Sequence, residues 1–372
     1  MELMDKALWS MADGQWFAMS NIDIKSSQGN YSVNFSSGLA DFENANFFYI
    51  IDRSIASNQI LNRLDRSRTL LVDGSERTKT IEFCSELISK LAELGVNRKS
   101  SLVAIGGGSV QDAVTLSASL YMRGIPWYFV PTTFMSMADS CIGGKSAINV
   151  GKFKNLVGNF YPPCEIRLEQ AFLLSLPAHA VASGLSESVK IQIAKGPGAF
   201  YEFQAKFNLY NTSGDTSILL EIARMSILSK KWFIEIDEYD KKERQLLNYG
   251  HSFGHALESA SNMGIPHGLA IGVGMLVANS QVSQNAYSSE INGIVKDILK
   301  NSGFDFSLLS VDLDGFMKAL RMDKKNSQQN QVLILPNSQN QLEIRSFELS
   351  TARLEEQSNI LVNVLDELRK CS

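Results

Sequence analysis

SLVAIGGGSVQDAV, residues 101–114, joins a short apolar run to three glycines and then to a segment with helical apolar spacing. This order indicates a buried strand, a tight turn and a helix whose first backbone N–H groups are open to a phosphate. Gly106, Gly107 and Gly108 lack the GxGxxG spacing of the ordinary dinucleotide-binding loop. A tight turn in which Ser109 caps the helix would give the same pattern. The stretch therefore predicts a strand, a turn and a helix, and leaves nucleotide binding as one of two explanations.

The residues on either side repeat this alternation. Apolar runs at 46–54, 67–75 and 127–133 are typical of strands, and the segments from Thr80 to Leu94 and from Val110 to Met122 are typical of helices. Strands that alternate with helices favour a parallel sheet wound on both faces.

The pattern changes after about residue 170. Apolar residues then recur every three or four positions, which predicts helices to the end, with QVLILP (331–336) as one strand-like exception. We therefore expect an α/β nucleotide-binding domain with a mostly parallel sheet in residues 31–170, and an all-α domain in residues 171–372. The active site is expected in the cleft between them. Residues 1–30 are polar and irregular, and we expect an extension there.

Composition excludes several classes of partner. The 372 residues carry a net charge of −4, which gives no general attraction for nucleic acid or for an anionic membrane. No apolar run approaches the roughly 18 to 20 residues that cross a bilayer, and the first residues are acidic where a signal peptide would be basic. The cysteines have no paired spacing, which predicts reduced thiols and a cytoplasmic protein; they are Cys84, Cys141, Cys164 and Cys371.

Three of the four histidines lie in NYGHSFGHALESASNMGIPHG, residues 248–268. A helix would place His251 and His255 on one face, four residues apart, and His267 would arrive from the next segment. Chance clustering or a satisfied core pair is the simplest explanation for one histidine. Two at this spacing with a third nearby favour a metal site built from a helix and a loop.

Three lysines gather in DSCIGGKSAINVGKFKNLVGNFYPP, residues 139–163, at positions 145, 152 and 154. A solvated loop is the usual explanation for such a run. Apolar neighbours such as Ile142, Ile148 and Leu156 indicate structured chain instead. A fixed lysine near a glycine-rich turn suits a phosphate ester.

Taken in order, these motifs resemble those of 3-dehydroquinate synthase and the related sugar phosphate cyclases, from about Tyr31 to about Leu335. In that family a VPTT strand end leads to an aspartate, a GGK turn and a later KN pair. Here these are residues 130–133, Asp139, residues 143–145 and residues 154–155. The family's later motifs appear as GLSESVK, NYGHSFGH and PHG.

The resemblance implies two cofactors. A divalent metal, zinc or cobalt, would be held by Glu187, His251 and His267, while His255 would face the substrate. The second cofactor is NAD, and the implied contacts come from Asp52, Glu76, Lys79, Gly107, Gly108, Ser109, Asp112, Thr132, Thr133, Asp139, Lys145 and Lys154.

The implied reaction converts 3-deoxy-D-arabino-heptulosonate 7-phosphate to 3-dehydroquinate and phosphate, through transient oxidation by NAD, elimination, reduction and aldol closure. The implied catalytic residues are Asp139, Lys145, Lys190, Lys230, Arg244, Asn248 and His255. The substrate would also contact Asn155, Lys324, Lys325 and, from the neighbouring subunit of a homodimer, Arg123.

Lys230 and Arg244 decide the substrate in this resemblance, because they would bind its C1 carboxylate. A guanidinium buried opposite a neutral sugar would be unpaired and would cost roughly 3 to 5 kcal/mol. We therefore expect the carboxylate substrate, unless Arg244 is exposed or pairs with Glu238 or Glu243.

The chain departs from the family pattern at two places near these sites. Leu269 stands where a glutamate often follows the PHG histidine and glycine, and Ser54 stands where an asparagine is common near the cofactor. A divergent family member is therefore expected.

Three other functions stay open. One is another sugar phosphate cyclase, such as an amino-dehydroquinate synthase or a sedoheptulose 7-phosphate cyclase. The second is a metal-dependent polyol dehydrogenase, which shares the architecture but usually has an aspartate as first metal ligand and lacks the GGK and KN segment. The third is a non-catalytic regulator, which would not need both the metal residues and the phosphate lysines.

Overall fold

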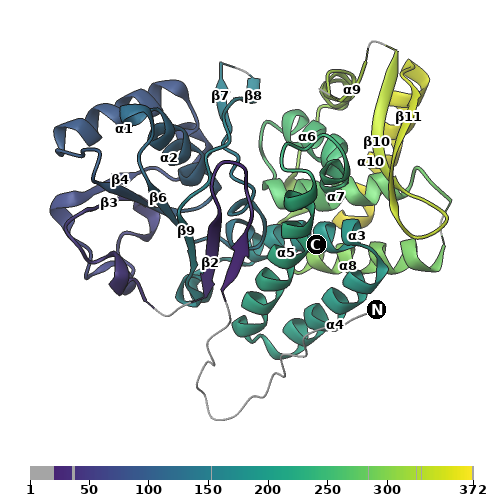
Figure 1. Ribbon diagram of the computed structural model, residues 1–372. Coiled ribbons are helices and arrows are strands. Elements are labelled where there is room, and N and C mark those ends of the chain that lie inside the picture. Colours follow the sequence, from purple (N-terminus) through teal and green to yellow (C-terminus); the bar gives the residue numbers. More distant parts are fainter. Residues whose placement is uncertain are drawn as a thin grey trace.

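The chain forms an α/β half and a helical half, which lie side by side in Figure 1. The structure is a computed structural model, and it describes residues 21–35, 38–151, 153–283, 285–323, 325–327 and 329–370. The expected boundary near residue 170 falls between the last strand of the sheet, which ends at Leu168, and the helix that begins at Ala178.

Seven strands form one sheet in the order β1-β2-β9-β6-β5-β3-β4. Neighbouring strands are parallel except for β1 and β2, which form an antiparallel hairpin at one edge. The predicted α/β fold with a mostly parallel sheet is confirmed. The strands are β1 (Ile22–Ile24), β2 (Tyr31–Phe35), β3 (Phe47–Asp52), β4 (Thr69–Val72), β5 (Ser101–Gly106), β6 (Trp127–Pro131) and β9 (Glu165–Leu168).

The β1–β2 hairpin corrects one expectation. Residues 1–30 are predicted to be an irregular extension, but Ile22–Ile24 is a strand of the sheet. Ile22 and Ile24 are buried while Asp23 is exposed, so the strand does alternate. Three residues are too few for that alternation to stand out in the sequence. Residues 1–20 lie outside the described part of the chain.

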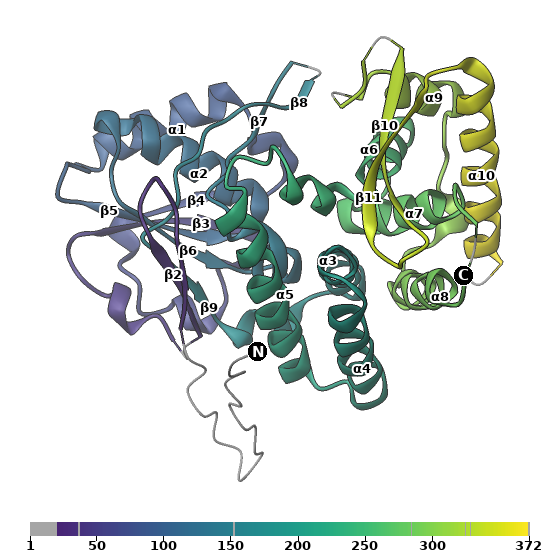
Figure 2. The same cartoon turned by 45° about the vertical axis from the view of Figure 1, so that its right-hand side comes forward.

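Helices α1 (Ile81–Glu93) and α2 (Gly108–Leu120) pack against each other on one face of the sheet (Figure 2). The connections from β4 to β5 and from β5 to β6 step in the same direction across the sheet, and right-handed crossovers then put both helices on the same face. The connection from β3 to β4 steps the other way. Its short 3₁₀ turns therefore cover the opposite face, where Leu61 and Leu64 are buried.

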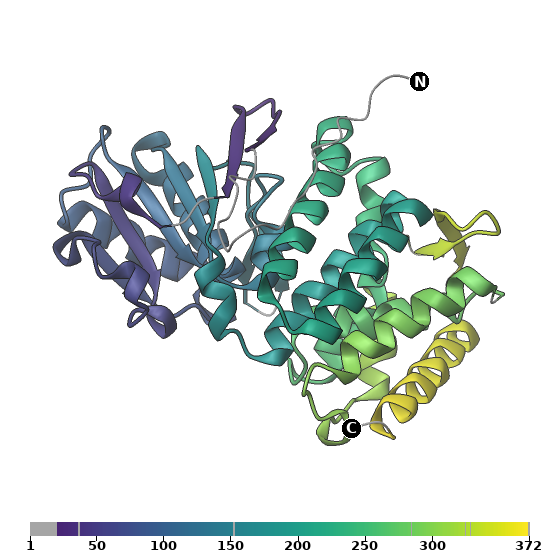
Figure 3. The ribbon, with the colours of Figure 1, turned by 90° about the horizontal axis from the view of Figure 1, so that it is seen from below.

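Helices dominate the second half, as predicted. They are α3 (Ala178–Lys195), α4 (Pro197–Ser213), α5 (Thr216–Ile236), α6 (His251–Ala260), α7 (His267–Asn279), α8 (Ala286–Lys300), α9 (Leu313–Arg321) and α10 (Thr351–Arg369). Seen from below, the C-terminal helix α10 lies at the outer rim of this half (Figure 3). No helix in the described ranges is long and apolar enough to span a membrane.

The second half is not purely helical. The predicted strand-like exception is β10 (Asn330–Pro336), and it pairs with β11 (Leu342–Glu348) in an antiparallel hairpin. The expectation of an all-α domain is wrong in this respect. Most residues of β11 are polar or exposed, so the sequence carries no clear buried face for it.

Two glycines allow the halves and helices to meet closely. A Cβ on Gly184 in α3 would collide with the ring of Phe134, which follows β6 in the α/β half. A Cβ on Gly268, at the start of α7, would collide with the backbone of Ser183 in α3. Because both positions are glycine, α3 packs directly against the loop after β6 and against the start of α7.

The Ile148–Val150 and Phe153–Val157 segments form a separate small hairpin, β7–β8, between the two halves (Figure 1).

Candidate active site

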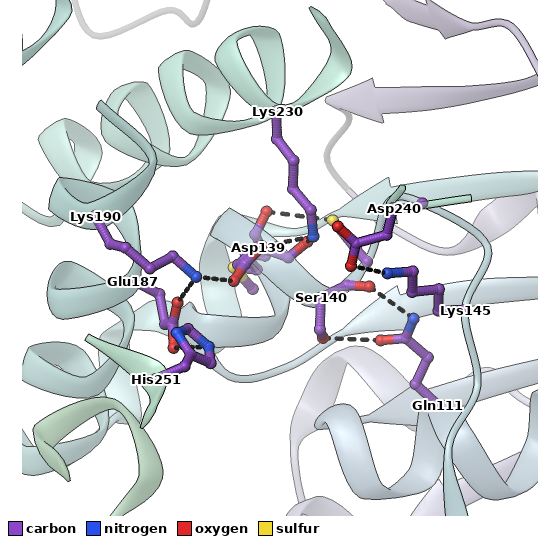
Figure 4. Close-up of polar contacts among 12 residues, drawn as sticks. Gln111, Asp139, Ser140, Lys145, Glu187, Lys190, Lys230, Asp240 and His251 are labelled. Atoms are coloured by element: carbon purple, nitrogen blue, oxygen red, sulfur yellow. Dashed lines mark hydrogen bonds and ion pairs between the residues drawn. The ribbon is translucent and has the colours of Figure 1, made fainter. Parts of the chain in front are cut away.

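Asp139 stands at the centre of a network of charges between the two halves (Figure 4). It lies on the π-helical turn Ser136–Ser140 that follows β6. Its carboxylate is 2.5 Å from Nζ of Lys230 on α5 and 3.5 Å from Nζ of Lys190 on α3. Burial raises the pKa of Asp139, but the two ammonium groups outweigh this effect and hold that pKa below its ordinary value. Asp139 is therefore an ionised carboxylate held between two lysines.

Glu187 connects this network to the histidines. It forms an ion pair with Lys190, one turn further along α3. Its Oε1 atom lies 3.3 Å from Nε2 of His267 and 3.8 Å from Nε2 of His251. His251 and His255 lie four residues apart on α6, and His267 begins α7. The structure thus brings together the residues that the sequence nominates for a metal.

The geometry fits a divalent metal ion. Each of the three histidines offers a ring nitrogen, and these atoms lie within 4.8 Å of one another. Glu187, whose side chain is 2% exposed, adds a carboxylate, so the site has four candidate donors, one more than the resemblance names. Four nitrogen and oxygen donors suit zinc or cobalt.

His251 and His267 differ in their protonation. Burial and the charge of Lys190 hold the pKa of His251 well below its ordinary value, so the ring is neutral. Burial lowers the pKa of His267, but hydrogen bonds to Glu187 and Glu258 outweigh it and raise that pKa to about 10. A metal bound by Nε2 of His267 would therefore displace a proton.

Glu258 is a site residue that sequence analysis misses. Its Oε2 atom lies 3.2 Å from Nδ1 of His267. Metal-binding histidines usually place their second nitrogen against such a carboxylate, which fixes the ring. Leu269, where the family often has a glutamate, is fully buried. The sequence does contain a signal, because Glu258 follows His251 by seven residues and His255 by three, which is the spacing of one helix face.

Arg244 is buried, and the charge of Asp240 acts on it without direct contact. The residue is 3% exposed, and in the described ranges no carboxylate lies within 4.0 Å of its guanidinium. The guanidinium instead donates to the backbone carbonyl of Glu238 at 2.5 Å. Exposure of Arg244, or pairing with the carboxylate of Glu238 or Glu243, is therefore ruled out within this structure.

Lys145 is a second cation near Arg244. Its Nζ atom lies 2.7 Å from Oδ2 of Asp240 (Figure 4). Burial and the nearby Arg244 charge lower the pKa of Lys145, against the opposing pull of Asp240. Lys145 and Arg244 thus repel each other, which is the arrangement expected of a pocket that receives an anion.

Asn248 and Lys325 flank the histidines. Asn248, which lies three residues before His251, donates to the carbonyl of Gln245 at 3.1 Å. Lys325 donates to Ser252 Oγ at 3.0 Å, and its charge acts on His251 and His255. Lys324 lies outside the described residues.

The predicted nucleotide residues gather at the carboxyl ends of the central strands. Gly107 caps α2, and Gly108 and Ser109 are the first residues of that helix. A Cβ on Gly107 would lie 3.1 Å from the methyl group of Thr133, so a larger residue would crowd the turn. Thr132 and Thr133 directly follow β6. The helix start offers backbone N–H groups to a phosphate at the position where dinucleotides bind in such sheets.

Acidic groups surround the same sheet edge. Asp52, at the end of β3, accepts hydrogen bonds from the backbone and the hydroxyl of Ser54 at 2.9 and 2.8 Å. Lys79 is buried and pairs with Asp112 at 2.9 Å. Glu76 accepts a hydrogen bond from Asn149 at 2.9 Å. The carboxylates and the lysine that the resemblance implies for NAD thus lie at the same end of the sheet.

Three of the nominated residues have their contacts or their place away from Arg244. Asn155 Oδ1 accepts from Lys79 at 2.9 Å, so Asn155 lies with the nucleotide residues. Lys154 reaches to the helical half, where its Nζ is 3.8 Å from Glu258. Arg123 is exposed beyond the far end of α2, about 20 Å along the helix from Gly108.

Comparison with known proteins gives matches over most of the chain. The profile of the 3-dehydroquinate synthase N-terminal region matches residues 69–183, and that of the 3-dehydroquinate synthase C-terminal region matches residues 184–326. The 3-dehydroquinate synthase of Sulfolobus acidocaldarius is 37% identical over 292 residues, which cover 76% of this chain and 81% of the relative. That of Saccharolobus solfataricus is 32% identical and covers 81% and 86%.

Solved structures share the fold. A 2-deoxy-scyllo-inosose synthase solved with carbaglucose-6-phosphate, NAD+ and Co2+ is 24% identical, with a TM-score of 0.76, and the match covers 92% of this chain and 99% of the other. The 2-epi-5-epi-valiolone synthase of Streptomyces hygroscopicus, solved with NAD+ and Zn2+, is 22% identical with a TM-score of 0.74, covering 96% and 99%. A probable glycerol dehydrogenase from Sinorhizobium meliloti is more distant, at 13% identity and a TM-score of 0.59, covering 90% and 97%.

Proposed function

The chain belongs to the 3-dehydroquinate synthase family, and on that basis we propose that it converts 3-deoxy-D-arabino-heptulosonate 7-phosphate to 3-dehydroquinate and phosphate. The enzyme is a carbon–oxygen lyase. The hydride removed from a secondary alcohol carbon is later returned to the same carbon, the C–O bond to phosphate breaks, and a new C–C bond closes the ring. No net oxidation results.

The buried guanidinium of Arg244 is the observation that supports this substrate. It is 3% exposed and has no carboxylate within 4.0 Å in the described ranges. A neutral sugar would leave this charge unpaired, at a cost of roughly 3 to 5 kcal/mol. A substrate carboxylate would pair with it, and Lys230 would supply a second positive charge.

Glu187, His251 and His267 are the residues that would hold a divalent metal ion, zinc or cobalt. Such an ion, when bound, polarises a substrate hydroxyl and stabilises negative charge on its oxygen. His255 is exposed, so it remains available to the substrate. Lys190, placed between Glu187 and Asp139, keeps both groups ionised and oriented.

Residues 107–109 at the start of α2, with Thr132 and Thr133, would hold the pyrophosphate of NAD, and Asp52 and Glu76 would accept its ribose hydroxyls. NAD, when bound, supplies the hydride acceptor. Ser109 lies in the first turn of α2, and the paired Lys79 and Asp112 would lie beside the bound nucleotide.

The substrate phosphate would lie between the two halves, held by Lys145, Asn248, His255 and Lys325. Oxidation makes the neighbouring C–H acidic, and the phosphate group itself can accept that proton as it leaves. Lys145 would place its positive charge beside the departing anion. Burial and Arg244 lower the pKa of Lys145, and its pairing with Asp240 opposes that effect. Arg123 would reach this phosphate from the partner in a homodimer, because within one chain it lies at the far end of α2.

A phosphate-release assay tests the function directly. Purified protein with NAD and zinc or cobalt is given 3-deoxy-D-arabino-heptulosonate 7-phosphate, an amino analogue and sedoheptulose 7-phosphate. Turnover should be fastest with the first. Faster turnover of sedoheptulose 7-phosphate would refute the substrate assignment, and accumulation of NADH with glycerol-type polyols would identify a polyol dehydrogenase instead.

A further inference from the structure

The turn of the β1–β2 hairpin binds the segment that precedes Arg244. Ser26 Oγ donates to Oε1 of Glu238 at 2.5 Å, and the backbone N–H of Ser27 lies 3.2 and 3.1 Å from the two oxygens of that carboxylate. The Ser27 hydroxyl is also 2.8 Å from the hydroxyl of Tyr239. Glu238 and Tyr239, which are consecutive and precede Arg244 in the chain, are thus both hydrogen-bonded to the hairpin turn. Figures 1 and 2 show the hairpin beside α5, whose end leads into this segment.

Glu238 transmits this contact to Arg244. Its side chain is held by the hairpin, and its backbone carbonyl accepts the guanidinium of Arg244 at 2.5 Å. Fixing the carboxylate therefore restricts the direction of the carbonyl of the same residue. Among the described residues, the hydrogen bond that the guanidinium donates is to this carbonyl, so the carbonyl has a large share in its orientation.

The base of the hairpin supports Arg244 from a second side. The hydroxyl of Tyr31, which is 4% exposed, accepts the backbone N–H of Gly143 at 2.8 Å. Gly143 has a φ of +107° and lies so close to Arg244 that a Cβ there would collide with the guanidinium. One hairpin therefore contacts two backbone segments, at Glu238 and at Gly143, that lie against the guanidinium.

These contacts are not needed for the sheet itself. Ser26 and Ser27 lie in the turn, beyond the strand pairing of Ile22 with Val33 and Ile24 with Tyr31. Their hydrogen bonds reach residues about 210 positions away. A hairpin that served only the sheet edge would leave these serines to solvent.

We propose that the β1–β2 hairpin is a positioning element for Arg244, and that it sets the affinity for the substrate carboxylate through Ser26, Ser27 and Tyr31. The effect on substrate affinity rests on the proposed function, whereas the effect on Arg244 does not. A binding group that is displaced by a fraction of an ångström loses a large part of its contribution, and a hairpin fixed at two points prevents this.

Ser26→Ala and Tyr31→Phe test the proposal, each removing one hydroxyl. Both should raise KM for 3-deoxy-D-arabino-heptulosonate 7-phosphate about tenfold, the effect of a weakened hydrogen bond to a charged group, with kcat within about twofold of wild type. Both should also speed the labelling of Arg244 by phenylglyoxal, followed by mass spectrometry of its peptide. Ser26→Thr keeps the hydroxyl and should behave as wild type. Asp23→Asn, an exposed substitution on β1, is the matched control.

The labelling rate of Arg244 tests the positioning role of the hairpin, and KM tests the binding of a substrate carboxylate. Unchanged labelling of Arg244 in Ser26→Ala overturns the positioning role, whatever happens to KM. Faster labelling with an unchanged KM supports the positioning role and instead contradicts a substrate carboxylate at Arg244. If the wild-type protein does not turn over this substrate, labelling alone decides the hairpin's role. If Tyr31→Phe does not fold, Ser26→Ala, in a turn, gives the answer by itself.

Discussion

Glu258 Oε2 lies 3.2 Å from Nδ1 of His267, while Nε2 of the same ring lies 3.3 Å from Glu187. One imidazole is therefore held between two carboxylates, one at each nitrogen. The Nε2 side faces Glu187, so Glu258 would act on a bound metal through the ring. The sequence pattern alone could not distinguish this role from that of an ordinary helix carboxylate.

Replacing Glu258 should weaken metal binding without removing a ligand. Glu258→Gln keeps the size of the side chain but loses its charge, so the His267 ring is less well fixed and less basic. We expect metal affinity to fall about 10- to 100-fold, measured by competition with a chelator. Glu169→Gln is the control, because Glu169 is also buried but contacts the backbone of Gly38 at another site. Equal affinities in Glu258→Gln and wild type would contradict the role of Glu258.

The histidines should separate into two classes. His251→Ala and His267→Ala leave too few donors for zinc and should lose stoichiometric metal and turnover. His255→Ala should keep the metal and lose activity, because this exposed residue is assigned to the substrate. Metal content is measured by elemental analysis after dialysis. Equal metal in all three variants would show that the assignment of ligand and substrate roles is wrong.

Asp237 should stabilise the fold in a pH-dependent way. Its carboxylate accepts the backbone N–H groups of Lys241, Lys242 and Arg244 at 2.9, 2.6 and 3.2 Å. Burial raises its pKa, but these hydrogen bonds outweigh burial and lower it below the ordinary value. A lowered folded-state pKa means that the stabilisation is complete above the unfolded value of about 3.9 and is lost as the pH falls through the folded value.

The test of Asp237 compares urea unfolding of wild type and Asp237→Asn. The variant should lose about 1.5 to 3 kcal/mol of unfolding free energy at neutral pH. The difference should shrink once the pH is well below about 3.9. Asp23→Asn, at an exposed position, should match wild type throughout. A difference that stays constant down to low pH would mean that the carboxylate charge is not the cause.

The predictable parts of this molecule are those that depend on local sequence patterns. Strand β5 with the start of α2 is one contiguous stretch, and His251 with His255 is one helical spacing. The candidate metal ligands and the lysines are predicted by short motifs in a fixed order.

What sequence analysis missed depends on distant contacts. The role of Glu258 can be recognised only in the fold, where α7 places His267 next to it. The same holds for Asp240, because its partner Lys145 belongs to the other half of the molecule. The hairpin turn at Ser26 looked like an irregular polar segment, because its partner Glu238 lies 212 residues away. Strand β11 is not predicted for a different reason. Its residues are mostly exposed or polar, so the alternation of apolar and polar residues is too weak to indicate a strand.

The nucleotide preference should depend on Asp52. Its carboxylate lies at the end of β3, where it would accept ribose hydroxyls and repel a 2′-phosphate. We expect NAD to restore activity to cofactor-stripped enzyme and NADP to do so poorly, and Asp52→Ala to raise KM for NAD at least about tenfold. Asp65→Ala is a close control, because Asp65 makes the same turn with Ser67, at 2.9 and 2.7 Å, but just before β4 begins. Equal rescue by NADP would contradict this assignment.

The choice of substrate should depend on the charge of Arg244. Its guanidinium is 3% exposed and has no carboxylate within 4.0 Å among the described residues, so a neutral replacement removes a buried charge that an incoming anion would pair with. Arg244→Gln should therefore cut kcat/KM for 3-deoxy-D-arabino-heptulosonate 7-phosphate by 100-fold or more, which corresponds to about 3 kcal/mol of lost pairing. With sedoheptulose 7-phosphate, which has no carboxylate, the same variant should lose little or should even gain, because an unpaired charge has been removed from the pocket. Arg321→Ala, at an exposed position on α9, serves as the control for general effects of losing an arginine. Steady-state phosphate release with both substrates measures the ratio, and an equal loss on the two would show that Arg244 does not recognise a carboxylate.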